Sequence, residues 1–175
     1  AVVHASQFEV GVEMPATGLN TELQDPVLSN FIIDCNNKAD IGFYCYRSTH
    51  IQANNIAITK SRAHGFLVIG TFSGRFNNSV AYNNEENGFT IGVDVFGWAR
   101  LEYLVNNVRF ENIAANNNGT AKTFNATTNP TGGVGFRISI NRAVVVTSIS
   151  CETNDGFGMY VEGGNYAGGN IIDTG

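Results

Sequence analysis

Charged residues are scarce in this chain of 175 residues: 14% are Asp, Glu, Lys or Arg, and the formal net charge is −5. Lys and Arg form no cluster, so we do not expect a nucleic-acid partner, whose phosphates attract clustered basic residues. No apolar run reaches the roughly 18 residues typical of a membrane-spanning helix. The length fits one domain.

Cysteine is also sparse, with three residues and no Cys-x-x-Cys pair, which disfavours a zinc site. Cys45 and Cys151 fall in apolar strand patterns and are interpreted as small core residues. A disulfide between Cys35 and Cys45 stays open. The sequence shows no Ser/His/Asp set and no Gly-rich phosphate loop, so no such motif assigns it a reaction.

What the chain does have is a repeat. A Gly-Phe pair recurs with gaps of 23, 23, 47 and 21 residues, and an Asn column and short apolar segments share its period. The Gly-Phe pairs are Gly42-Phe43, Gly65-Phe66, Gly88-Phe89, Gly135-Phe136 and Gly156-Phe157. A repeat of roughly 21–28 residues, rich in β-branched residues, cannot bury a core alone and must stack on its neighbours.

Alternation of period two predicts which side chains of each repeat point inward. The predicted inner columns are Phe43, Phe66, Phe89, Phe136 and Phe157, then Cys45, Val68, Ile91, Ile138 and Met159, and a third of Ile32, Ile56, Val80, Val108, Ile149 and Ile171. The Asn column, Asn30, Asn54, Asn78 and Asn106, predicts an amide ladder, and Thr147 and Gly169 continue the column where Asn is absent. The alternative is that Asn is simply common in the loops of this chain.

Three short strands per repeat, with like residues in register, resemble the right-handed parallel β-helix family, the pectin-lyase-like superfamily. That group includes pectate lyases, polygalacturonases, alginate lyases and epimerases, and bacteriophage tailspikes. The resemblance covers about residues 27–175 and implies an all-β fold: a right-handed parallel β-helix, a solenoid of about five coils with an Asn ladder.

The repeat also predicts the organisation of the chain. Residues 1–26 are expected to hold an incomplete N-terminal coil and a loop, and insertions are expected at 95–103 and 116–131. An uncapped β-helix end would expose strand edges. We therefore expect the chain to be part of a longer protein, or a homo-oligomer in which a partner subunit covers an end.

Both insertions flank the sheet of Gly-Phe strands, and loops on one face of a repeat array usually build its binding surface. Outward aromatic rings beside carboxylates and amides suit a sugar, because rings stack on its apolar face. The predicted polysaccharide-binding residues are Tyr44, Tyr46, Trp98, Asn141 and Tyr160. For Trp98 the alternative is a plug that folds back over the sheet.

Asp94 and Glu162 are the predicted acid/base pair. Aligned in one column two coils apart, they would be about 9.6 Å apart, near the separation of about 6.5–9.5 Å in inverting glycosidases. Arg137 is the third catalytic candidate, because it resembles the Arg of the pectate lyase groove. The Asp-Pro-His motif of mannuronan epimerases and the Asn-Thr-Asp motif of polygalacturonases are absent. The alternative is a pair of solvated carboxylates.

Glu111 and Glu152, aligned on adjacent coils, could hold a Ca²⁺ with Asn83, although an ordinary solvated pair is the alternative; no other cofactor is expected. Together these patterns predict an extracellular domain, secreted or on a virion surface, that binds a polysaccharide. Whether it also cleaves the polysaccharide, as a hydrolase or a lyase, stays open. The rival interpretation is a non-catalytic structural or adhesive shaft of a fibre or surface protein.

Overall fold

The computed structural model describes residues 2–4, 10–14, 23–93, 104–121, 125, 132–139, 141–162 and 171–173. These residues form an all-β structure without a helix, so they contain no helical membrane span. The strands are β1 (Val2–His4), β2 (Val10–Met14), β3 (Leu23–Gln24), β4 (Val27–Asp34), β5 (Ile41–Tyr46), β6 (Ser48–Thr49), β7 (Gln52–Thr59), β8 (His64–Ile69), β9 (Arg75–Asn77), β10 (Val80–Tyr82), β11 (Asn87–Ile91), β12 (Val105–Asn106), β13 (Arg109–Asn116), β14 (Phe136–Ile138), β15 (Asn141–Arg142), β16 (Val145–Ser150), β17 (Met159–Val161) and β18 (Ile171–Asp173).

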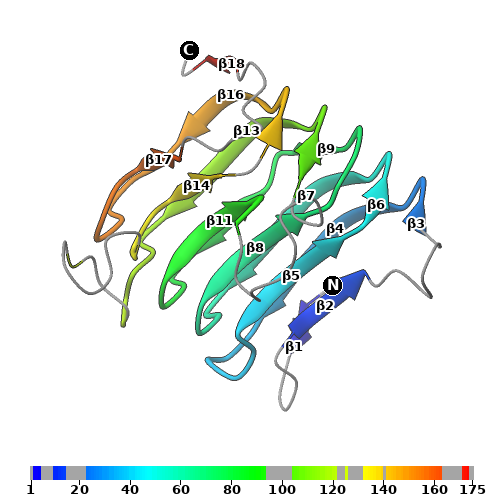
Figure 1. The fold of residues 1–175 in the computed structure, drawn as a ribbon. Coiled ribbons are helices and arrows are strands. Elements are labelled where there is room, and N and C mark those ends of the chain that lie inside the picture. Colours follow the sequence, from blue (N-terminus) through cyan, green and yellow to red (C-terminus); the bar gives the residue numbers. More distant parts are fainter. Residues whose placement is uncertain are drawn as a thin grey trace.

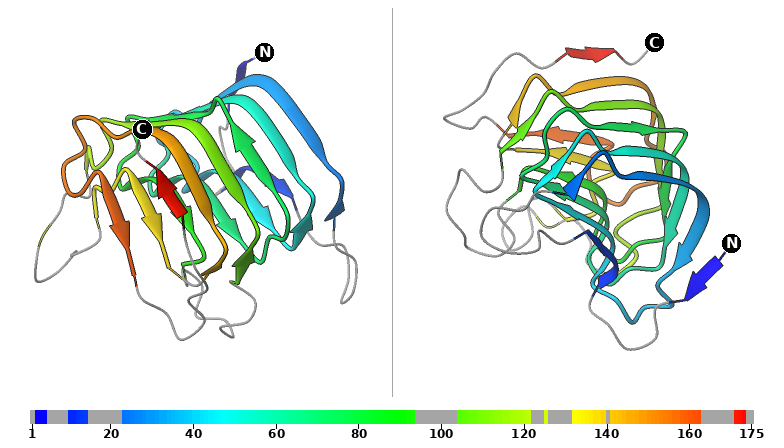
Figure 2. Two further views of the ribbon diagram at one scale, coloured as in Figure 1. Left: turned by 90° about the horizontal axis from the view of Figure 1, so that it is seen from above. Right: turned by 90° about the vertical axis from the view of Figure 1, so that its right-hand side faces the viewer.

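Every described strand pair is parallel, and the strands belong to two main sheets (Figure 1). The long-strand sheet has the order β1-β4-β7-β10-β13-β16-β18, with β9 pairing with both β7 and β13. The Gly-Phe sheet has the order β17-β14-β11-β8-β5-β2. Two small sheets, β3-β6 and β12-β15, are linked through Phe72. Within each main sheet the strands lie side by side in sequence order, as Figure 2 shows from two further directions.

The register of the Gly-Phe sheet confirms most of the predicted Phe column. Phe43 lies opposite Phe66, Phe66 opposite Phe89, and Phe89 opposite Phe136. All four side chains are fully buried, and the centroids of successive rings are 5.5, 4.4 and 5.3 Å apart.

The fifth member of that column was predicted wrongly. Met159, not Phe157, lies opposite Phe136, and Phe157 is 44% exposed. The glycine that aligns with Gly135 is therefore Gly158, two residues after the Gly of the last Gly-Phe pair. Phe157 precedes that glycine, and its ring packs against that of Tyr160 instead of entering the Phe column.

A second stack of rings comes from the long-strand sheet. Phe76 and Phe110, on β9 and β13, are opposite each other, with ring centroids 4.9 Å apart. The Phe110 ring meets that of Phe136 edge to face at 5.2 Å, so the two sheets share one aromatic core. Offset and edge-to-face ring pairs of this kind add to the free energy of burial.

The predicted inner column of the long strands is wrong by one residue in places. Phe31 lies opposite Ile56, while Ile32 and Val80 both lie opposite Ala57. Ile32 is exposed, and the fully buried residues are its neighbour Ile33 and the opposing Ile58. The slip arises because the bend residue Asn30 lies opposite Asn55, not Asn54, so Ile32 follows its bend by two residues and Ile56 by one.

Those bends form a column of residues with positive φ: Asn30, Asn55, Asn78, Asn112 and Ser148. Asn tolerates this left-handed backbone region better than most residues. Nine of the seventeen described non-glycine residues with positive φ are Asn, which accounts for much of the chain's Asn content.

Amides on this bend bond from one repeat to the next. Asn78 Nδ2 donates to Asn54 Oδ1 at 2.9 Å, as predicted, and Asn112 Nδ2 donates to Asn78 Oδ1 at 2.6 Å. Asn106 does not belong to this column, because it lies on β12 opposite Arg142. This ladder is exposed, so the prediction of buried amides is wrong here.

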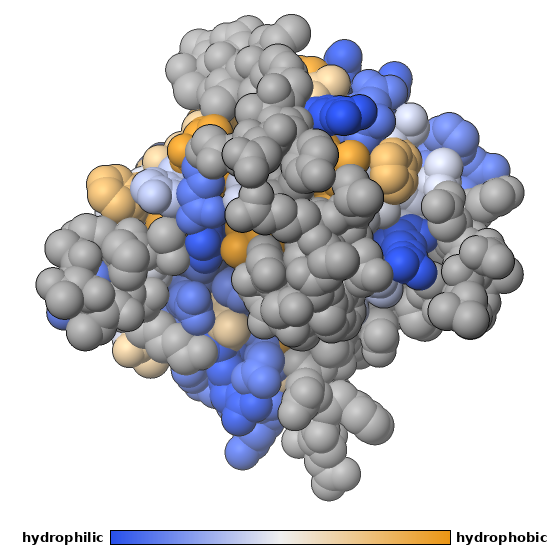
Figure 3. All heavy atoms as spheres, viewed as in Figure 1, coloured by the Kyte–Doolittle hydropathy of each residue, from blue (hydrophilic) through white to orange (hydrophobic). Residues whose placement is uncertain are grey.

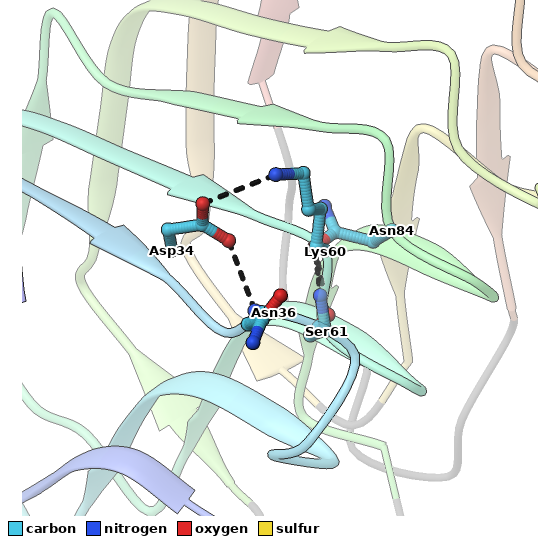
Figure 4. Close-up of polar contacts among 5 residues, drawn as sticks. All are labelled: Asp34, Asn36, Lys60, Ser61 and Asn84. Atoms are coloured by element: carbon cyan, nitrogen blue, oxygen red, sulfur yellow. Dashed lines mark hydrogen bonds and ion pairs between the residues drawn. The ribbon is translucent and has the colours of Figure 1, made fainter. Parts of the chain in front are cut away.

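A second ladder, which the sequence analysis missed, is buried at the turn before the Gly-Phe strands. Ser61 Oγ donates to Asn84 Oδ1 at 2.7 Å, and Asn118 Nδ2 donates to Asn154 Oδ1 at 2.8 Å. Figure 4 shows the first of these contacts beside the ion pair of Lys60 with Asp34, in which the charged atoms are 3.1 Å apart. Through Ser61, Asn84, Asn118 and Asn154 the ladder links four successive turns, beside backbone hydrogen bonds between the same turns.

Glycine is required beside this ladder because two backbones approach closely. A Cβ at Gly65 would lie 2.7 Å from the carbonyl oxygen of Gly88, and one at Gly88 would lie 2.6 Å from that of Gly135. Real Cβ atoms do not approach a backbone oxygen so closely. The recurring glycine of the sequence is thus a packing requirement.

Candidate functional site

The outward face of the Gly-Phe sheet, where the binding residues were predicted, divides into two parts. In the part formed by β5 and β8, Tyr44 is 4% exposed, and Leu67 and Ile69 are fully buried. They pack with Ile41 in a separate cluster, against which Tyr46 is partly buried. Tyr44 was predicted as an outward ring open to a sugar; it does point outward, but it is covered.

At β14 and β17 the outward face carries an ion pair. Arg137 lies opposite Tyr160, and its Nε and Nη2 atoms both donate to Glu162 Oε1, at 3.1 and 2.6 Å. The side chains of Arg137 and Glu162 are 15% and 26% exposed. Charge-assisted hydrogen bonds of this partly buried kind hold both groups in a fixed orientation.

Two aromatic rings precede Glu162 in the chain, and one of them, Tyr160, lies opposite Arg137. The rings of Phe157 and Tyr160 are stacked, with centroids 5.7 Å apart and planes 27° apart. Phe157 is one of the few large hydrophobic side chains that are exposed among the described residues, together with Val27, Ile32 and Val161. On the face drawn in Figure 3, hydrophobic and hydrophilic described residues are interspersed. We call Arg137, Phe157, Tyr160 and Glu162 the Arg137–Glu162 site.

The structure describes only Glu162 of the predicted acid/base pair. Backbone hydrogen bonds from Glu162 N to Ile138 O and from Ser139 N to Ile91 O place Glu162 opposite Ser139, and Ser139 opposite Gly92. Asp94 follows two residues after Gly92 and lies outside the described residues, as does Trp98. Asn141, predicted between the two carboxylates, belongs to another sheet, where it lies opposite Val105.

The predicted calcium pair is also separated by the register. Glu111 lies opposite Thr147, whereas the backbone N of Glu152 donates to the side chain of Asn116. The alignment failed because it crossed the bend at Asn112, where the alternation shifts. Within the described part of the chain, no group of three or more His, Cys, Asp and Glu side chains is placed to hold a metal ion.

The three cysteines are free thiols, so the open question of a Cys35–Cys45 disulfide is answered in the negative. Cys45 is buried in the core, as predicted, and burial raises the pKa of its thiol from 9.0 to about 11. Burial, and then the charge of Asp34, raises the pKa of Cys35 to about 12. Thiols with pKa values this high are protonated at neutral pH and are therefore poor nucleophiles.

Arg137 holds Glu162 in place, because its guanidinium donates two hydrogen bonds to that carboxylate. Its predicted catalytic role, as the base of a lyase, stays a prediction. Both of its bonds go to Oε1, which leaves Oε2 of Glu162 to accept a bond from a ligand hydroxyl. The site can therefore bind a polar ligand and stack against its apolar face.

Sequence reasoning named Arg137, Tyr160 and Glu162 but missed Phe157 as a surface residue. The spacing of the buried ladder could have identified it, because Ser61, Asn84 and Asn154 each precede a glycine of the Gly-Phe sheet by four residues. That spacing selects Gly158 over Gly156 and places Phe157 outside. No family model, curated protein or solved structure matches this chain.

Proposed function

We propose that this chain is a right-handed parallel β-helix that binds a polysaccharide at the Arg137–Glu162 site. The β-helix is supported by the parallel pairing of each strand with the strand one repeat later, in two main sheets that share a core. The handedness rests on the general preference of parallel crossover connections and on the resemblance to the pectin-lyase-like superfamily.

One observation carries the proposed ligand: an exposed Phe157 ring is stacked on Tyr160, which lies opposite Arg137 of a fixed Arg–Glu pair. An exposed aromatic ring can stack on the apolar face of a sugar. The guanidinium can donate to ring or hydroxyl oxygens, and Glu162 Oε2 can accept from a hydroxyl. Ligand surfaces commonly combine an apolar base with a few fixed polar groups in this way.

The site supports binding better than cleavage. Inverting hydrolysis requires a second carboxylate across the scissile bond, and retaining hydrolysis requires one about 5–5.5 Å away. The column of Glu162 holds Ser139 and Gly92 at the next two positions, neither of which is acidic. We therefore propose a polysaccharide-binding domain, located outside the cell or on a virion, and cleavage of the polysaccharide stays an open part of the test.

Glycan-array screening followed by calorimetric titration with the best ligand tests this proposal. Phe157→Ala and Glu162→Gln are each expected to weaken binding by about tenfold, equivalent to about 1.4 kcal/mol. Arg62→Gln is the matched control. Arg62 forms an ion pair with Asp40, with their charged atoms 2.6 Å apart, and does not belong to the Arg137–Glu162 site.

Two outcomes would contradict the proposal. One is that the protein binds no glycan. That result would favour the structural shaft, an interpretation that is also consistent with the ladders and ring stacks along the repeat. The other is a glycan affinity that neither site variant changes. Release of unsaturated or reducing-end products would instead show that the domain cleaves its ligand.

A further inference from the structure

Two arginines lie side by side on the outward face of the long-strand sheet. Arg75 on β9 is opposite Arg109 on β13, on paired strands about 4.8 Å apart. Each is followed by a buried Phe, Phe76 or Phe110, so strand alternation directs both guanidiniums outward, and both residues are exposed.

Neither arginine has an acidic partner within the part of the chain that the structure describes. The described Lys and Arg ion pairs involve Lys60, Arg62 and Arg137. Like charges directly opposite each other on a sheet are destabilising. This arrangement is costly without a counter-charge, although the chain as a whole carries a net charge of −5.

A polar hollow of about 380 Å³ adjoins this pair. It is lined by Val27, Leu28, Ser29, Gln52, Ala53, Asn54, Arg75 and Asn77. Gln52 lies opposite Arg75, and Asn54 opposite Asn77, so amides continue the face from the arginine pair towards β4. Hydroxyl and amide groups in this arrangement can donate to and accept from the hydroxyls of a sugar.

We propose that this face is a second binding site, which takes a phosphate group carried on a saccharide. A phosphate monoester has three terminal acceptor oxygens and nearly twice the charge of a carboxylate, so it suits two adjacent guanidiniums better than a carboxylate does. Arg75 and Arg109 bind the phosphate, and Gln52 and Asn54 in the hollow contact the sugar. Glu111 follows Arg109 by two residues on the same face of the strand and lies opposite Asn77. Its negative charge repels anions, so an anion that bonds only weakly to the arginines is kept out.

This proposal does not depend on polysaccharide binding at the Arg137–Glu162 site, which lies on the other main sheet. Titrating the protein at pH 8 and constant ionic strength with glucose 6-phosphate, inorganic phosphate, acetate and glucose tests it. We expect glucose 6-phosphate to bind more tightly than inorganic phosphate, and acetate and glucose to bind at least about tenfold more weakly than either phosphate.

Arg75→Gln and Arg109→Gln are each expected to lower the affinity for glucose 6-phosphate by about tenfold. Both side chains are exposed and repel each other, so we expect neither variant to melt below the wild type. Arg62→Gln, whose arginine is already paired, should bind normally. Four results would overturn the proposal: no binding of either phosphate, unchanged affinity in both variants, an equal loss in Arg62→Gln, or equal affinities for inorganic phosphate and glucose 6-phosphate.

Discussion

Asn84 Nδ2 donates a hydrogen bond to Asn118 Oδ1 at 2.8 Å, and both side chains are buried. The contact between Asn78 and Asn54 has the same chemistry and nearly the same length, 2.9 Å, but is exposed to water. Water can replace the exposed bond and cannot reach the buried one. The two ladders are therefore expected to contribute differently to stability.

Asn118→Ala should lower the free energy of unfolding by about 3 kcal/mol. The substitution leaves the backbone and side-chain N–H groups of Asn84 without their acceptor, and each unsatisfied buried group costs about 1–3 kcal/mol. Asn78→Ala, the exposed counterpart, should cost under about 1 kcal/mol. Urea denaturation of both variants gives the comparison, and equal losses would refute the distinction between the ladders.

Phe89→Ala should cost about 3–5 kcal/mol through the cavity that it leaves. The Phe89 ring contacts those of Phe66 and Phe136 at 4.4 and 5.3 Å, so its loss breaks the stack in the middle. Phe157→Ala removes an exposed ring and should cost under about 1 kcal/mol. Comparing the two in thermal unfolding tests the assignment of Phe157 to the surface; a large loss for Phe157→Ala would contradict it.

Gly65→Ala should destabilise the protein by about 1–3 kcal/mol, because the new Cβ would meet a backbone oxygen that cannot move away. Gly158→Ala is a suitable control. Its Cβ would lie 3.2 Å from the nearest atom, the Cβ of Cys151, so that neighbour would need to move by only a few tenths of an ångström. Denaturant midpoints should therefore fall further for Gly65→Ala, and the reverse order would show that the backbones can separate.

Stability should decrease as the pH rises from about 9 to about 11, partly through Cys45. Burial keeps this thiol protonated in the folded state up to a pKa of about 11, whereas the unfolded thiol ionises near its ordinary value of 9.0. The unfolded state thus loses its proton first and gains stability. Denaturation midpoints measured across this range should fall more steeply for the wild type than for Cys45→Ala, in which this group is absent. Parallel curves would show that Cys45 is not the cause.

The Phe column was predictable because like side chains in register reveal the repeat. Phe43, Phe66, Phe89 and Phe136 follow a shared Gly, and burying large rings leaves few alternatives for that position. The bond between Asn54 and Asn78 was predictable for a similar reason, since the period brings them one repeat apart. Period and residue type together thus predicted the parallel pairing and most of the core.

The details near bends and turns were not predictable in the same way. A left-handed residue such as Asn112 shifts the alternation, and no residue type marks it with certainty: Ser148 and Thr153 also adopt positive φ. Register arguments that crossed such positions, including the one for Glu111 and Glu152, failed. The candidate site was only partly predictable, because alternation shows that Tyr44 points outward but not that it is covered.

Parallel pairing in sequence order gives this protein a direction-dependent resistance to force. Hydrogen bonds between paired strands such as β5 and β8 lie across the strands, so a pull perpendicular to the strands loads one pair at a time and peels it open. A pull along the strands instead shears all the bonds of a pair together. The force needed to separate the strands should therefore be low when the pull is perpendicular to them and high when it is along them.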